Sequence, residues 1–326
     1  MTELGSIDIM YTGIEANTIF YDPVFRDADL LAEFRVMPNV VNEKKMQFVT
    51  KLEKILRRYS GCGFTPIPGF NIYDRKIKVE KVKVDLALCA DEFFDTIFEE
   101  LLNRGTAIHD LTGTLIETIL IDKMREGIQL DVQRVAYFAD RSNPDPNYDQ
   151  LDGLWTVHYP YLATNDLAPY TDSGSGAALG AGDGIALLKA VYDRQALELR
   201  GLPDSMKKFN VTGSVWNQYR EDIENGGGGD YGLLTVINGV EVLKYRGIEI
   251  RPNWRWDDIM TNDLGSADSH LVELTVAENK ILATDLVNPG EDFLIWYDPK
   301  EEKLFAKTRF KLGVNYVHPR LLSFAY

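Results

Sequence analysis

A long basic arm near the N-terminus is the feature that most constrains this chain. Eleven lysines and arginines lie between Lys44 and Lys83 against three acids, although the 326-residue chain carries a net charge of −15. Two strand-like runs flank a turn-rich loop at residues 60–69, which predicts a β-hairpin. A two-stranded hairpin is only marginally stable in water, and like charges along it weaken it further. Because the arm cannot bury itself, it needs an acidic surface to lie on, and the rest of the chain is one. We therefore expect self-assembly.

The return run of this hairpin changes phase. Ile77 and Val79 alternate with polar residues, and a second apolar alternation runs from Val82 to Leu88. We interpret the slip at Glu80 as a β-bulge, which inserts one extra residue into a strand. The stretch from Asp85 to Asp110 is acidic, with seven acids against one arginine.

The predicted assembly interface joins the cations of the arm to the acids that follow it. The cations are Lys44, Lys45, Lys51, Lys54, Arg57, Arg58, Arg75, Lys76, Lys78, Lys81 and Lys83. The acids are Asp91, Glu92, Asp95, Glu99 and Glu100. A hairpin attached at one end cannot easily fold back onto the segment that follows it, so we expect the arm of one subunit to meet the acids of a neighbour.

Composition predicts a packed globular body. Hydrophobic residues make up 45% of the chain and aromatic residues 11%, which disfavours disorder. No apolar run approaches the roughly 18 residues of a membrane span, and the N-terminus lacks a signal-peptide core, so we expect synthesis in the cytosol. Cys62 and Cys89 form no CxxC pair and are expected to be reduced thiols. A pI near 4.8 gives the chain a negative electrostatic field overall, which disfavours general nucleic-acid binding.

The strongest predicted helix covers residues 114–139 and ends in a turn-rich linker, residues 141–153. Thr114 and Glu117 form a capping box at its start. Apolar residues follow at helical spacing: Ile116, Leu120, Met124, Ile128, Val132 or Val135, and Ala139. The linker is the best single domain boundary in the sequence.

The remaining pattern is mixed α+β. Helices are predicted over residues 27–34, 91–104 and 183–201, and over a segment that is capped at Thr212 or Ser214 and ends at the glycine run 226–229. Strands are predicted over residues 155–159, 233–237, 240–244, 247–250, 271–277, 281–285 and 292–298. A long last strand places Leu304, Ala306, Thr308, Phe310, Leu312, Val314 and Tyr316 on a core face. Lys307, Arg309 and Lys311 lie on its other, basic face.

Signals for catalysis, cofactors and metals are weak. The glycines at 174, 176 and 180 have the wrong spacing for a dinucleotide fingerprint and follow a loop. The acids around Asp145 lack the glycine and the final acid of a calcium loop, and the four histidines are scattered. Ser175 is not in a nucleophile elbow, and Trp254-Arg255-Trp256 is better explained by packing. We expect no catalytic, cofactor or metal site, although fifty carboxylates leave a chance acid pair open.

The order of these segments resembles the major capsid proteins of tailed bacteriophages, which have the Hong Kong 97-type fold. Three passages carry the resemblance: Gly61-Cys-Gly-Phe-Thr-Pro66 with Lys81-Val-Lys-Val-Asp-Leu-Ala-Leu-Cys89; Arg134-Val-Ala-Tyr-Phe-Ala-Asp140 into Asp152-Gly-Leu154; and Phe293-Leu-Ile-Trp-Tyr-Asp298 to Lys311-Leu-Gly-Val-Asn-Tyr-Val-His-Pro319. The first and last are similar to capsid proteins of phages or prophages of Bacteroidetes-type hosts.

The resemblance implies an N-terminal arm (1–40), an extended loop (41–88), a peripheral domain with a long spine helix (89–154 and 293–317) and an axial domain (155–292 and 318–326). It implies a shell of pentamers and hexamers around double-stranded DNA, without sequence-specific binding, with scaffolding, portal or decoration proteins as partners. The protein would be located in the virion capsid and, during assembly, in the host cytoplasm. Two alternatives stay open: a cellular nanocompartment (encapsulin-like) shell of the same fold, and an enzyme with an unrecognised site.

Overall fold

The computed structural model describes residues 9–11, 33–49, 56, 58, 72–89, 115–174, 178–226, 232–237, 240–265, 270–285, 293–298, 300–301 and 303–326. The helix predicted over 91–104, most of that over 27–34 and the cap at Thr114 lie outside these residues. The chain divides into two compact units. The first contains Met1–Leu31, Val36–Val157 and Ile281–Val317, and the second Ala32–Arg35, His158–Lys280 and His318–Tyr326.

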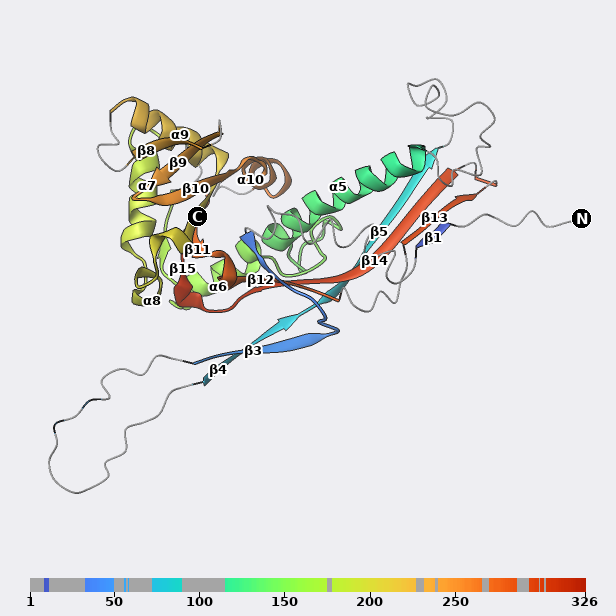
Figure 1. The fold of residues 1–326 in the computed structure, drawn as a ribbon, viewed down its shortest axis with the longest axis horizontal. Helices are drawn as coiled ribbons and strands as arrows, with labels where there is room; N and C mark the ends of the chain where they lie inside the picture. Colours follow the sequence, from blue (N-terminus) through green and yellow to red (C-terminus); the bar gives the residue numbers. More distant parts are fainter. Residues whose placement is uncertain are drawn as a thin grey trace, which may run out of the picture. The chain divides into compact units, whose positions relative to one another are not determined.

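A six-stranded sheet organises the first unit (Figure 1). Its strands follow the order β1 (Ile9–Tyr11), β13 (Phe293–Asp298), β14 (Lys303–Tyr316), β12 (Lys280–Thr284) and β2 (Arg35–Met37), and β5 (Glu80–Cys89) also pairs with β14. The alternation predicted for the last strand is confirmed. Ala306, Thr308, Phe310 and Leu312 are buried, whereas Arg309 between them is exposed.

The predicted long helix is present as α5 (Leu115–Phe138). Met124, Ile128, Val132 and Val135 are all buried, which confirms the apolar stripe. Both valines belong to this stripe because the last two turns of the helix are covered on more than one side.

The turns after α5 fold tightly against its end. The Asp140 amide donates a hydrogen bond to the Tyr148 carbonyl oxygen at 2.7 Å, and the Gly153 amide donates to the Ala139 oxygen at 2.7 Å. A Cβ on Gly153 would lie 2.7 Å from the backbone oxygen of Tyr137, so only glycine allows this close approach. The segment predicted as a linker is therefore a packed corner.

The second unit is built on a seven-stranded mixed sheet. Its order is β6 (Tyr170–Thr171), β15 (Leu322–Ala325), β11 (Val272–Val276), β7 (Lys207–Thr212), β10 (Ile248–Asn253), β9 (Val240–Tyr245) and β8 (Gly232–Ile237). The β10–β7 and β15–β6 pairs are parallel. The helices of this unit are α6 (Tyr159–Thr164), α7 (Asp183–Asp193), α8 (Leu197–Arg200), α9 (Gly213–Glu224) and α10 (Trp254–Asp258).

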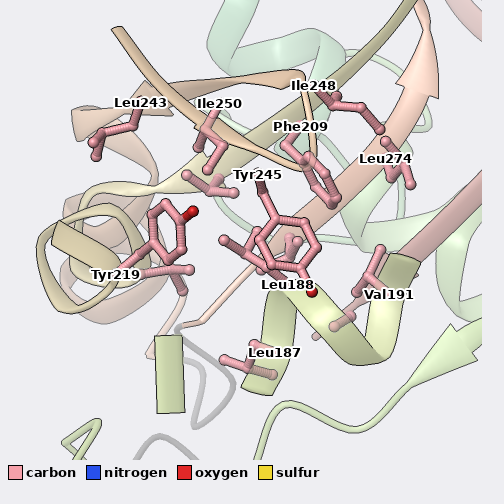
Figure 2. Packing of buried hydrophobic residues seen from close by; sticks show 14 of the residues in the cluster. Leu187, Leu188, Val191, Phe209, Tyr219, Leu243, Tyr245, Ile248, Ile250 and Leu274 are labelled. Carbon is pink, nitrogen blue, oxygen red and sulfur yellow. The ribbon is translucent and has the colours of Figure 1, made fainter. Parts of the chain in front are cut away.

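The core of this unit lies between the sheet and two of its helices (Figure 2). Leu188 and Val191 of α7 and Tyr219 of α9 pack with sheet residues such as Phe209 and Tyr245. The Tyr219 hydroxyl donates a hydrogen bond to the Lys244 carbonyl oxygen at 2.9 Å, and burial raises the pKa of Tyr219.

Two predictions for residues 155–201 are wrong. Residues 155–159 are not a strand: Leu154–His158 form a π-helical turn that leads into α6. Trp155, Tyr159 and Leu162 are all buried, and their spacing is helical rather than alternating. The helix predicted over 183–201 is interrupted between α7 and α8.

Some elements carry no clear sequence signal. Strands β7 and β15 were not predicted, and in β7 a buried Lys207 and Asn210 conceal the apolar pattern. Short helical turns cover Asp204–Met206, Ile259–Asp263, Ala277–Asn279 and Pro319–Leu321.

Candidate assembly interface

The predicted hairpin exists as a two-stranded ribbon, which Figure 1 shows as β3 and β4. Strand β3 (Glu43–Val49) pairs antiparallel with β4 (Ile72–Lys78), from Glu43 opposite Lys78 to Val49 opposite Ile72. Because both strands are paired only with each other in the described residues, the ribbon depends on contacts at its base.

The apolar alternation shifts near Glu80 because the chain changes its partner strand there. The β-bulge interpretation is wrong. Strand β4 ends at Lys78, and β5 begins at Glu80 and pairs with β14 instead of β3. Val79 lies between the two strands and donates its amide to the Asn42 oxygen at 3.0 Å.

The base of the ribbon is buried in its own subunit, which corrects the expectation that the arm cannot bury itself. Met46, Ile77 and Val79 form an apolar cluster with Ile281 and Ala283 of β12. Ile77 has no exposed surface. The sequence-based argument missed this because it treated the arm as isolated from the final strands.

Strand β14 holds the ribbon through specific polar contacts. The Asn315 side-chain amide donates to the Lys76 carbonyl oxygen at 3.0 Å. The Arg75 guanidinium carbon lies 3.8 Å from the centre of the Tyr316 ring, a cation–π geometry. Arg75 is therefore engaged within the subunit.

Apart from Arg75, the predicted interface residues fall into three groups. Lys44, Lys45, Arg58, Lys76 and Lys78 are exposed, and all of them except Arg58 lie on the ribbon. Lys81 and Lys83 lie on β5, which belongs to the large sheet. Lys51, Lys54, Arg57, Asp91, Glu92, Asp95, Glu99 and Glu100 lie outside the described residues. The docking of arm cations on these acids stays a prediction.

Two of these cations already have acidic partners in the chain. The Lys76 ammonium lies 2.9 Å from the Glu43 carboxylate, and the hydrogen bond from Lys76 lowers the pKa of Glu43. The Lys83 ammonium lies 2.6 Å from Asp85, and its hydrogen bond lowers the pKa of Asp85. Both pairs are exposed, so they contribute little to stability.

Pairing of β5 with β14 brings together cations that the sequence left separate. Lys307 lies opposite Asp85, Arg309 opposite Lys83, and Lys311 opposite Lys81. Directly opposite residues of an antiparallel pair share one face of the sheet. The period-two alternation of both strands was the available signal, but the pairing could not be read from it. We name Lys81, Lys83, Lys307, Arg309 and Lys311 the basic face.

The described residues offer no sign of a metal centre or a membrane span. No three of their His, Cys, Asp and Glu side chains are grouped to hold a metal ion. None of the helices in this part of the chain has both the length and the apolar character to cross a bilayer.

No protein-family model matches the sequence, and no curated protein does either. Solved structures do match, at low identity. A chain of the satellite phage P4 procapsid with its size determination (Sid) protein aligns with a TM-score of 0.56 and 10% identity, over 94% of this chain and 96% of that one. A chain of the capsid of Myoviridae phage XM1 aligns with a TM-score of 0.55 and 8% identity, over 91% and 90%.

A third match is a capsid chain of an empty GTA particle, with a TM-score of 0.51 and 12% identity, over 90% of this chain and 89% of that one. All three alignments cover nine tenths or more of this chain. The chain thus has the α+β fold of phage capsid proteins, the Hong Kong 97-type fold.

Proposed function

We propose that this protein is the major capsid protein of a tailed phage and assembles into the icosahedral or prolate head that encloses double-stranded DNA. The observation that supports the proposal best is the fold similarity to phage capsid chains, which extends over at least nine tenths of this chain. The β3–β4 ribbon adds to it, because its base packs in its own subunit while Lys44, Lys45 and Lys78 are exposed to a partner. A non-enzymatic, structural role follows from this proposal.

The two units suggest how roles are divided. We propose residues 1–40 as the N-terminal arm, 41–88 as the extended loop, 89–154 with 293–317 as the peripheral domain, and 155–292 with 318–326 as the axial domain. The division is supported by the unit boundaries after Val157 and Val317. The unit boundary at Lys280 precedes the proposed one at 292, because β12 joins the sheet of the first unit.

The proposed partners follow from the same role. Copies of the chain would form pentamers and hexamers, with scaffolding, portal or decoration proteins added during assembly in the host cytoplasm. On the resemblance of Gly61–Pro66 with Lys81–Cys89, and of Phe293–Asp298 to Lys311–Pro319, we propose relatives among the capsid proteins of phages or prophages of Bacteroidetes-type hosts.

Negative-stain microscopy and size-exclusion chromatography of the full chain test the proposal. We expect capsomer-sized species or closed shells. A protein that stays monomeric at every concentration contradicts it. Particles that enclose an enzyme and no nucleic acid would instead indicate a cellular nanocompartment.

A shortened ribbon provides the matched control. Val49 and Ile72 are directly opposite, so Asn-Gly can replace residues 50–71 as a two-residue hairpin turn. This variant should keep the circular dichroism of the full chain and fail to form shells. Normal shells from it would show that the distal ribbon has no part in assembly.

A further inference from the structure

The basic face places like charges directly opposite one another on β5 and β14. Lys83 lies directly opposite Arg309, and Lys81 directly opposite Lys311. Like charges at opposite positions of an antiparallel pair destabilise it. In this register Asp85 lies beside Lys83, Lys307 and Arg309, and the Lys311 ammonium lies 3.9 Å from the Asp285 carboxylate.

This face is accessible to a partner. Lys81, Lys83, Asp85 and Arg309 are exposed. The opposite face of β14 is buried through residues such as Phe310 and Leu312. Solvent-exposed charge on one side and core on the other make the basic face an outer surface of its unit.

An aromatic pair adjoins the cations. Trp296 lies opposite Phe305 in the β13–β14 pair, and the two rings stack with centroids 5.4 Å apart. Phe305 is two residues from Lys307, so it points to the same side of β14. On β5, the residue opposite Phe305 is the exposed Ala87, whose small side chain extends little above the sheet. The surface thus offers cations followed by an aromatic platform.

One segment of the chain has the complementary composition. Residues 91–100 read Asp-Glu-Phe-Phe-Asp-Thr-Ile-Phe-Glu-Glu, with five acids, three phenylalanines and no cation. Acids can pair with the ladder of cations, and phenylalanine rings can pack on the aromatic platform. A nucleic-acid backbone would match the cations alone, and the chain's net charge of −15 opposes its approach.

We propose that the basic face binds the segment Asp91–Glu100 of a second copy of this chain, and that this contact orients neighbouring subunits. The inference rests on the proposed function and gives it a second docking surface, separate from the β3–β4 ribbon. A second copy is favoured over the same chain because residue 91 follows β5 by only one residue. The chain would have to reverse at once to lay its acids on Lys83 and Lys81.

Two charge-reversal variants test the contact. The first carries Lys81→Glu, Lys83→Glu and Arg309→Glu, and the second carries Asp91→Lys, Asp95→Lys and Glu99→Lys. Each should fold but fail to assemble alone. An equimolar mixture should recover assembly, because each variant then supplies the charge that the other has lost. The control for the first variant replaces three other exposed cations with glutamate, Lys189, Arg255 and Lys300. It should assemble.

The outcomes separate the alternatives. If the mixture fails while a single chain with all six changes assembles, the contact is within one chain and the proposal is wrong. If the basic-face variant assembles normally but its particles lose nucleic acid, measured by absorbance, the partner is nucleic acid and the proposal is also wrong. A wild-type protein that never assembles contradicts the proposed function instead.

A peptide measurement tests the inference without any shell. A synthetic peptide of residues 90–102 should bind the full chain in 0.1 M salt and release in 1 M salt, because the Debye length falls from about 10 Å to about 3 Å. The basic-face variant should bind it about tenfold more weakly, as expected for the loss of three exposed pairs. Equal affinity for both proteins overturns the inference.

Discussion

A Cβ on Gly313 of β14 would meet the backbone carbonyl oxygen of Lys78, well inside van der Waals contact. It would also lie 3.1 Å from the Val79 Cα. Gly313 therefore allows β14 to pass directly against the residue where β4 ends and β5 begins. This close approach brings the base of the ribbon into contact with the large sheet.

We predict that Gly313→Ala lowers the free energy of unfolding by about 1–3 kcal/mol, the usual cost of overpacking, and reduces assembly. Urea unfolding measures the first effect and chromatography the second. Gly127→Ala in α5 is the control, because a Cβ there meets nothing within 4 Å. It should be neutral or stabilise the protein by about 0.4–1 kcal/mol. A Gly313→Ala protein as stable as wild type would refute the close approach.

The buried stripe of α5 gives a second prediction. Met124 is 5% exposed, so Met124→Asp places an uncompensated charge in the core and should cost several kcal/mol. We expect insoluble or unassembled protein. Leu130→Asp is the matched control on the same helix, because Leu130 is 40% exposed and should tolerate the change. Soluble, assembled Met124→Asp particles would show that the buried side of α5 is elsewhere.

Long periodic segments were predictable from the sequence because local pattern and burial agree there. Helix α5 and strand β14 have the predicted extents within a few residues, and their buried sides are the apolar ones. Both segments are long enough for many side chains to repeat one pattern.

Which strands pair with one another was not predictable in the same way. The phase slip near Glu80 was visible, but a bulge and a change of partner produce the same alternation in one strand. The two explanations differ only in which strand lies alongside. The basic face was missed for this reason, since Lys83 and Arg309 are more than two hundred residues apart.

Buried polar residues concealed another part of the fold. Glu273 in β11 has no exposed surface, and Lys280 is 1% exposed. The two side chains form an ion pair with each other. A sequence-based prediction places charged residues at the surface, so it misses such a buried pair.

This buried pair supports a third prediction. The Lys280 ammonium lies 2.8 Å from Glu273, which also accepts hydrogen bonds from Asn210 at 2.8 Å and from the Tyr159 hydroxyl. Glu273→Gln keeps the size but removes the charge, and should cost about 3–5 kcal/mol. The double variant Glu273→Leu/Lys280→Met removes both charges and should be more stable than Glu273→Gln. Thermal unfolding compares them, and a double variant less stable than the single one would contradict this account.

Acid should weaken the ion pair of the basic face. The pKa of Asp85 is lowered below its ordinary value of 3.8, mainly by the hydrogen bond from Lys83. Its contribution to stability is therefore complete above about pH 4 and is lost as the pH falls through the lowered pKa. The pair is exposed, so we expect an effect of at most about 1 kcal/mol. Asp85→Asn should be less stable than wild type at pH 7, and this difference in stability should shrink as the pH falls below about 4. A stability difference that does not change with pH would rule out the electrostatic origin.

The last prediction concerns the cations of the ribbon. Arg75 is engaged with Tyr316 and Lys76 with Glu43, so reversing either one would disturb the subunit as well as its docking. Lys44 and Lys45 are exposed on β3 and are better probes. We predict that Lys44→Glu/Lys45→Glu leaves the unfolding transition unchanged and blocks assembly in 0.1 M salt.

The physical reason is a network of weak pairs that repeats at every subunit contact. One exposed pair contributes about 0–1 kcal/mol, but repetition around a capsomer can fix orientation. Wild-type assembly should then weaken toward 1 M salt, where the Debye length is about 3 Å. Lys189→Glu/Lys300→Glu makes the same change of charge at exposed residues that do not belong to the ribbon, and should assemble as wild type. If the Lys44/Lys45 variant forms normal shells at low salt, the ribbon docks through apolar contacts and not by charge.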